Sequence, residues 1–139
     1  MKIRYTAISY TGVEEEIELP LYLRINDDGN INIGSKWRYV FKKVYKVDGY
    51  MRADVFFHEA TANFGVVDGF SVDMTYDQAK LEKEFGKAER LTEDEYLQAL
   101  AMSLGRLRLN GFDMEVDEIN TRRDQNRRHL ARHITERLK

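Results

Sequence analysis

The stretch 38-RYVFKKVYKVDGYMRADVFFH-58 decides the fold, because two long runs rich in aromatic and β-branched residues flank a tight-turn signal. Asp48-Gly49 is typical of a two-residue hairpin connection, since both positions tolerate positive φ angles. We therefore predict strands over Arg38–Val47 and Tyr50–His58.

Further strands are expected before and after this hairpin. In Val13–Leu19, one face holds Val13, Glu15, Ile17 and Leu19 and the other holds three glutamates, Glu14, Glu16 and Glu18. This alternation predicts a strand with one solvated face. Pro20 cannot donate to a sheet and marks an edge, a bulge or a break. The turn signal Asp27-Asp28-Gly29-Asn30 predicts a second hairpin. The remaining expected strands are Lys2–Tyr10, Leu21–Asn26, Ile31–Ile33 and a ragged one within Phe64–Met74.

The second half of the chain has helix signals. Thr75 and Gln78 match a capping box for a helix that runs to about Phe85 and stops at Gly86. Thr92 and Glu95 match the capping-box pattern more clearly than Thr75 and Gln78 do.

The helix that begins at Thr92 carries a broad apolar stripe and ends at Asn110-Gly111. It is expected to pack on the sheet. Phe112–Lys139 is predicted as one long helix with early acidic and late basic residues, in keeping with the helix dipole. The alternative is a short strand over Phe112–Asp117, followed by a helix that starts near Thr121.

The predicted fold is α+β: an N-terminal antiparallel β-meander of five or six strands, followed by three helices, the last long and arginine-rich. We expect one domain over residues 1–139, mainly β in 1–74 and mainly α in 75–139. The last helix is expected to lie partly free of the core.

Composition narrows the classes of function. The chain has 139 residues, no cysteine and a net charge of −2, which excludes disulfides and thiolate metal sites. No apolar run has the length of a membrane span, and the first residues do not form a secretion signal. A soluble, cytoplasmic protein without a membrane partner is expected.

The last predicted helix supplies the principal candidate site. Its apolar positions recur at three- and four-residue steps, but Arg123 and Arg127 occupy two of the places where this rhythm requires an apolar residue. Residues 118–139 hold 7 basic and 3 acidic residues, whereas residues 1–117 hold 15 and 21. The candidate anion-binding residues here are Arg122, Arg123, Arg127, Arg128 and Arg132.

Two other interpretations of this helix remain open. It can dock on the acidic body of the same chain, or it can pair with a second copy through a near-heptad seam in which polar residues set the register. The second interpretation predicts a homo-oligomer.

A second candidate site lies in the central strand. The strand contributes Trp37, Arg38, Tyr39 and Lys42, which could stack on bases and contact phosphates. The alternative is a core strand with an aromatic face turned inward and a lysine face in solvent. In that case Trp37, Tyr39, Phe41 and Tyr45 form the inner face.

No motif predicts catalysis, a metal or a cofactor. His129 and His133 are one helical turn apart, but no third ligand follows at a useful spacing. His58-Glu59 lacks the second histidine of a zinc-protease helix and lies in a β region. Phosphate loops, dinucleotide fingerprints and nucleophile elbows are absent from the sequence. We therefore expect a protein that is not an enzyme.

Two functions follow as hypotheses. The first is a small binding or regulatory protein whose C-terminal helix contacts nucleic acid or a phosphate-bearing small molecule such as a nucleotide. The second is a protein-interaction or inhibitor module that engages a basic partner protein. It would use acidic surfaces at Glu14, Glu16 and Glu18 and at Glu93, Asp94 and Glu95.

Overall fold

The structure is a computed structural model that describes residues 3–8, 14–27, 35–61, 65–84 and 88–138. In the last helix, side chains are described only as far as residue 125. The predicted strand Ile31–Ile33 and turn residues 28–30 lie outside the described residues.

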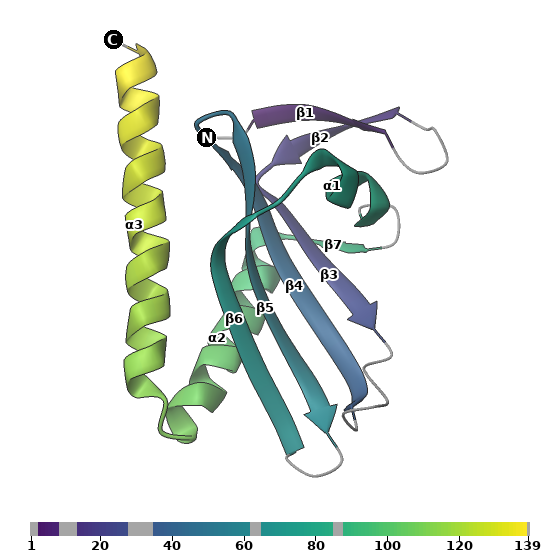
Figure 1. Cartoon of the computed structure of the whole chain (residues 1–139), viewed down its shortest axis with the longest axis vertical. Coiled ribbons are helices and arrows are strands. Elements are labelled where there is room, and N and C mark those ends of the chain that lie inside the picture. Colours follow the sequence, from purple (N-terminus) through teal and green to yellow (C-terminus); the bar gives the residue numbers. More distant parts are fainter. Residues whose placement is uncertain (1–2, 9–13, 28–34, 62–64, 85–87, 139) are drawn as a thin grey trace.

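A five-stranded antiparallel sheet forms the centre of the protein, in the order β6-β5-β4-β3-β7. Four of its strands follow one another along the chain as a meander: β3 (Leu21–Asp27), β4 (Ser35–Val47), β5 (Tyr50–Thr61) and β6 (Gly65–Thr75). The α+β class and the antiparallel arrangement are therefore confirmed (Figure 1).

The β4–β5 hairpin closes where the sequence predicts. Val47 pairs with Tyr50, and the two turn residues have positive φ angles of 53° at Asp48 and 80° at Gly49. These angles match the twist of the flanking strands, which is why Asp-Gly favours this connection.

The fifth strand of the sheet, β7 (Glu89–Leu91), was not predicted. It pairs antiparallel with β3, and an ion pair joins Arg24 to Glu89 across the two strands. A three-residue strand is too short to give a recognisable alternation. Its position depends instead on the open edge of β3.

The first two strands do not extend the meander. β1 (Ile3–Ile8) and β2 (Glu14–Leu19) form a separate two-stranded antiparallel sheet. The predicted alternation of β2 is confirmed in its described part, where Ile17 and Leu19 are buried and Glu18 is exposed. Pro20, reached through a cis peptide bond, separates β2 from β3, as its chemistry predicts.

Three helices follow, α1 (Gln78–Glu84), α2 (Glu93–Leu109) and α3 (Asp113–Leu138). The prediction of a long C-terminal helix is confirmed over the strand alternative. No helix among the described residues has both the length and the apolar character needed to cross a membrane.

The helix caps confirm one prediction and correct another. At α2, Glu95 N donates to Thr92 Oγ1 over 3.2 Å and Thr92 N donates to Glu95 Oε1 over 3.0 Å, which is the predicted capping box. The predicted cap of α1 is wrong, because Thr75 still belongs to β6. Asp77 caps this helix instead, and its carboxylate accepts from Lys80 N over 2.8 Å.

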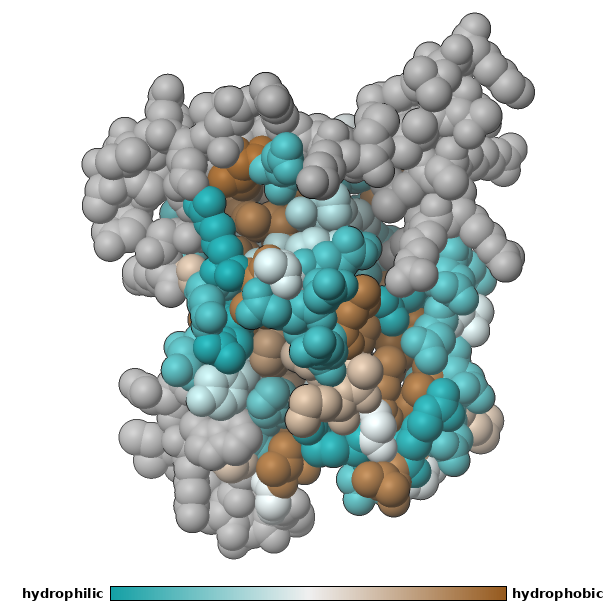
Figure 2. Space-filling view, turned by 180° about the vertical axis from the view of Figure 1, so that it is seen from behind, coloured by the Kyte–Doolittle hydropathy of each residue, from teal (hydrophilic) through white to brown (hydrophobic). Residues whose placement is uncertain are grey.

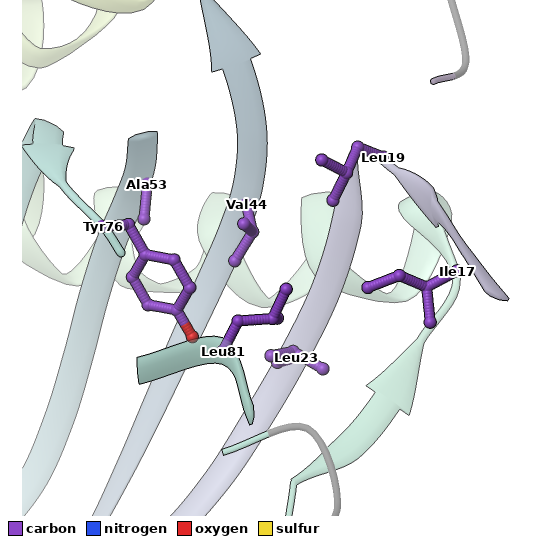
Figure 3. Close-up of a cluster of buried hydrophobic side chains, with 7 residues drawn as sticks. All are labelled: Ile17, Leu19, Leu23, Val44, Ala53, Tyr76 and Leu81. Carbon is purple, nitrogen blue, oxygen red and sulfur yellow. The ribbon is translucent and has the colours of Figure 1, made fainter. Parts of the chain in front are cut away.

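Elements cover both faces of the sheet (Figure 1). On one, the α1 face, the β1–β2 hairpin and α1 enclose a cluster of buried side chains (Figure 3). Its members are Ile17, Leu19, Leu23, Val44, Ala53, Tyr76 and Leu81.

On the other, the α2 face, Tyr96 and Leu100 of α2 pack against three aromatic side chains of the sheet: Tyr22, Phe41 and Phe56. The Phe41 and Phe56 rings are stacked with centroids 4.7 Å apart. The prediction that the second helix packs on the sheet is confirmed.

Helix α3 contacts both α2 and β6 and runs beside β6 (Figure 1). Val116 is fully buried, whereas Met114 is 83% exposed. Within its described side chains, α3 is therefore partly free of the core, as predicted.

Candidate anion-binding site

The two faces of β4 have different roles, because successive side chains of a strand point to opposite sides. Phe41 and Tyr45 are buried, and Tyr39 packs against the aromatic cluster on the α2 face. This confirms the interpretation of the aromatic face as core. Tyr39 is therefore not part of an open stacking platform, and the side chain of Trp37 lies outside the described residues.

Lys42 is on the opposite face and is not solvated, which corrects the expected lysine face. Its Nζ donates to both carboxylate oxygens of Glu84, at 2.7 and 2.9 Å, and lies 5.4 Å from the centroid of the Tyr76 ring. The side chain of Lys42 is only 11% exposed, because α1 covers this part of the sheet.

Tyr76 completes this network. Its hydroxyl donates to Glu84 Oε2 over 2.7 Å. Burial raises the pKa of Tyr76, and the hydrogen bond to Glu84 raises it further. Tyr76 therefore remains a hydrogen-bond donor at neutral pH, and the Glu84 carboxylate accepts from both partners.

A cavity of about 290 Å³ lies next to this network, on the α1 face. We call it the basic pocket. Its walls include Ile25, Val40, Val55 and Met74, and its charged side chains are Arg38, Lys42, Lys80 and Glu84. Because Glu84 is already bound by Lys42, the positive charge of Arg38 and Lys80 is not offset by another carboxylate of the lining.

Arg38 is the side chain of this pocket whose hydrogen-bonding capacity is most clearly unused. Its guanidinium carbon lies 4.5 Å from the centroid of the Phe57 ring, which holds the planar group against the sheet. Its Nε is buried and has no hydrogen-bond partner within the described part of the chain. A buried donor of this kind is costly unless a ligand or water accepts from it.

The two described arginines of α3, Arg122 and Arg123, do not line this pocket. Arg122 is 60% exposed and pairs with Glu118, with 2.9 Å between Nη2 and Oε1. Arg123 is half-buried, and its charge lowers the pKa of Tyr96 in α2 against the effects of burial and of Asp54, which both raise it.

The other predicted arginines, Arg127, Arg128 and Arg132, have side chains outside the described residues. The structure thus brings Arg38 and Lys42 together and separates them from Arg122 and Arg123. The candidates whose side chains the structure describes therefore fall in two regions of the molecule, not in one site.

Sequence reasoning missed Lys80, Glu84, Tyr76 and Phe57 as members of the pocket region. They come from α1, β5 and the segment before α1, and no spacing along the chain connects them to Arg38. The only available signal was the capped helix at residue 78, whose short amphipathic pattern predicts a docked element without saying where it docks.

No group of three or more potential metal ligands occurs among the described residues. His129 and His133 fall in the part of α3 whose side chains are not described. His58 lies in the strand β5 and not in a helix, which agrees with the rejection of the zinc-protease helix motif.

The chain matches no family model, no curated protein and no solved structure.

Proposed function

We propose that this protein is a small non-enzymatic binding protein that takes a small anion with an apolar body, such as a phosphate monoester, in the basic pocket. The observation that carries the proposal is Arg38, whose buried Nε has no partner among the described residues and which borders a cavity also lined by Lys42 and Lys80. A planar guanidinium suits the oxygens of phosphate and carboxylate groups.

The composition of the walls favours a ligand that is not a bare ion. Val40, Val55 and Met74 are apolar, and the Tyr76 side chain also lines the cavity. Such a surface gains from contact with a carbon-rich group, while Arg38 and Lys80, which pair with no carboxylate among the described residues, fix the anionic end. The volume of about 290 Å³ is at the lower end for ligand pockets and fits a small molecule better than a polymer.

The test is a calorimetric or NMR titration with phenyl phosphate, with inorganic phosphate as the comparison. Arg38→Met and Lys80→Met are each expected to weaken phenyl phosphate binding about ten-fold or more, because a hydrogen bond to a charged group contributes about 1.5–3 kcal/mol. Lys83→Met is the matched control, since Lys83 lies on the same helix and does not line the pocket.

Retained affinity in both Arg38→Met and Lys80→Met would contradict the proposal, as would equal losses in Lys83→Met. Binding of phenyl phosphate no tighter than inorganic phosphate would show that the apolar walls contribute nothing.

A nucleic-acid ligand on α3 gives a different result. A single-stranded oligonucleotide would then bind with an affinity that falls steeply with salt, because counterions are released. That binding would be lost in Arg123→Met and kept in Arg38→Met. This outcome would move the anion site from the basic pocket to α3.

A further inference from the structure

A second cavity, of about 810 Å³, lies between β6 and α3, away from the basic pocket. We call it the β6–α3 groove. Seven consecutive residues of β6, Val66 to Val72, line it on one side. On the other side, the lining comes from the end of α2, from Phe112 and from the first three turns of α3: Leu107, Asn110, Phe112, Glu115, Glu118, Ile119 and Arg122. An uninterrupted run of lining residues means that the groove follows the strand lengthwise.

The side of β6 away from β5 is an open edge. The sheet order places β6 last, and no other strand among the described residues pairs with it. An edge strand presents backbone N–H and C=O groups that can pair with another extended segment. Residues 66–72 span about 20 Å, at roughly 3.3 Å per residue, which is room for a strand of about six residues.

Apolar side chains along the groove are incompletely covered. Val66, Val67 and Phe112 are 45%, 37% and 46% exposed. In the view from behind, hydrophobic surface lies open between hydrophilic ridges to the right of the centre (Figure 2). Alternate side chains of an added strand would find apolar contacts here.

The charges of the groove indicate the chemistry of its occupant. Its charged lining residues are Asp68, Glu115, Glu118 and Arg122. Two of the carboxylates are already neutralised: Arg106 Nε and Nη2 donate to Asp68 at 3.0 and 2.8 Å, and Glu118 pairs with Arg122. Glu115 has no ion-pair partner in the described part of the chain, so the groove has one uncompensated negative charge.

We propose that the β6–α3 groove binds an extended peptide segment of a partner protein, with alternating apolar residues and a basic residue placed against Glu115. The segment would add to the sheet as a sixth strand beside β6, with its side chains between the sheet edge and α3. Main-chain pairing supplies affinity in this mode and the side-chain contacts supply selectivity. The proposal concerns a different surface from the basic pocket and does not depend on it.

The probe is an eight-residue peptide of alternating valine and lysine, titrated into the full chain and followed by NMR chemical shifts. We expect shifts concentrated in β6 and the first half of α3. A peptide with glutamate in place of lysine is expected to bind at least ten-fold more weakly. A peptide with N-methylated backbone amides, which cannot donate to β6, is expected to lose binding.

Glu115→Lys is expected to weaken the valine–lysine peptide about five-fold or more. Its matched control is Glu93→Lys, which reverses an exposed glutamate in the first turn of α2, outside the groove. The control keeps binding if the effect is local. Folding of each variant is checked by circular dichroism, and Phe112→Ser gives a second, uncharged test of the groove.

Three outcomes would overturn the proposal. The first is equal binding of the lysine and glutamate peptides, and the second is shifts confined to regions outside β6 and α3. The third is a stable dimer in light scattering whose amide protection covers β6, because a second copy would then occupy the edge.

Discussion

The Lys42 ammonium lies 2.7 Å from Glu84 Oε1 and ties the central strand β4 to helix α1 across 42 residues of sequence. The two side chains are 11% and 19% exposed, so little solvent screens the pair. This contact fixes α1 over the sheet and forms one wall of the basic pocket.

Breaking this pair on one side is expected to be costly. Glu84→Leu leaves the Lys42 ammonium buried without its carboxylate, and the free energy of unfolding should fall by about 3 kcal/mol. The double variant Lys42→Met/Glu84→Leu should recover most of this loss, because it leaves no buried charge. Urea denaturation measures both. A double variant as unstable as the single one would mean that the pair itself, and not the orphaned charge, sets the stability.

Three tyrosines are expected to resist ionisation. Burial raises the pKa values of Tyr45, Tyr76 and Tyr96 above the usual value near 10, and neighbouring carboxylates raise them further. A raised folded-state pKa gives stability that is complete below the unfolded pKa and is lost as pH rises through the folded one. The free energy of unfolding should therefore decline above about pH 10.

Ultraviolet absorbance measures this titration directly, because the phenolate absorbs differently from the phenol. Of the 8 tyrosines of the chain, these three should titrate last and together with unfolding. Tyr76→Phe should reduce the alkaline decline. Simultaneous titration of all tyrosines near pH 10 in the folded protein would contradict the assignment.

The pKa of His58 is shifted in the opposite direction, and its effect on stability should appear at mildly acidic pH. Burial lowers its pKa and the charge of Arg106 lowers it further, while Asp68 opposes them. The unfolded chain then takes up a proton first as pH falls below about 6.5, so stability declines from there toward the folded pKa. NMR titration of the imidazole should give a value below 6.5. In His58→Phe, which keeps the ring packing near Phe41, the decline should become shallower.

Gly69 is expected to be intolerant of a side chain. A Cβ at this position would lie 2.2 Å from Cε1 of Phe57, so Gly69→Ala must displace that ring. The loss should be about 1–3 kcal/mol, as for other overpacked sites. Because Arg38 rests on the same ring, the basic pocket should change as well, with weaker phenyl phosphate binding.

The control for this change is Gly105→Ala in α2, where nothing lies within 4 Å of an added Cβ. A helical glycine replaced by alanine should leave stability equal or raise it by up to about 1 kcal/mol. Thermal denaturation of both variants compares them. Equal stability of Gly69→Ala and the native chain would show that Phe57 moves at no cost.

The sequence predicted the elements whose signals are local. Each of these signals depends on a few neighbouring residues. They are the Asp48-Gly49 turn, the alternation of β4, the Thr92–Glu95 capping box and the end of α2 near Asn110. The cap of α1 was predicted wrongly because Thr75 and Asp77, two residues apart, are both suitable N-cap residues. Thr75 pairs with β5 as the last residue of β6, so Asp77 caps the helix.

The sequence by itself therefore determined the α+β class, the order of most elements and the aromatic core face of β4. Only the tertiary structure decided that β1 and β2 leave the meander, that β7 closes the edge beside β3, and that Lys42 is buried against Glu84. It also separated Arg38 and Lys42 from the described arginines of α3. Turns and caps depend on backbone preferences of adjacent residues, whereas the basic pocket depends on contacts between α1 and the sheet that no local spacing encodes.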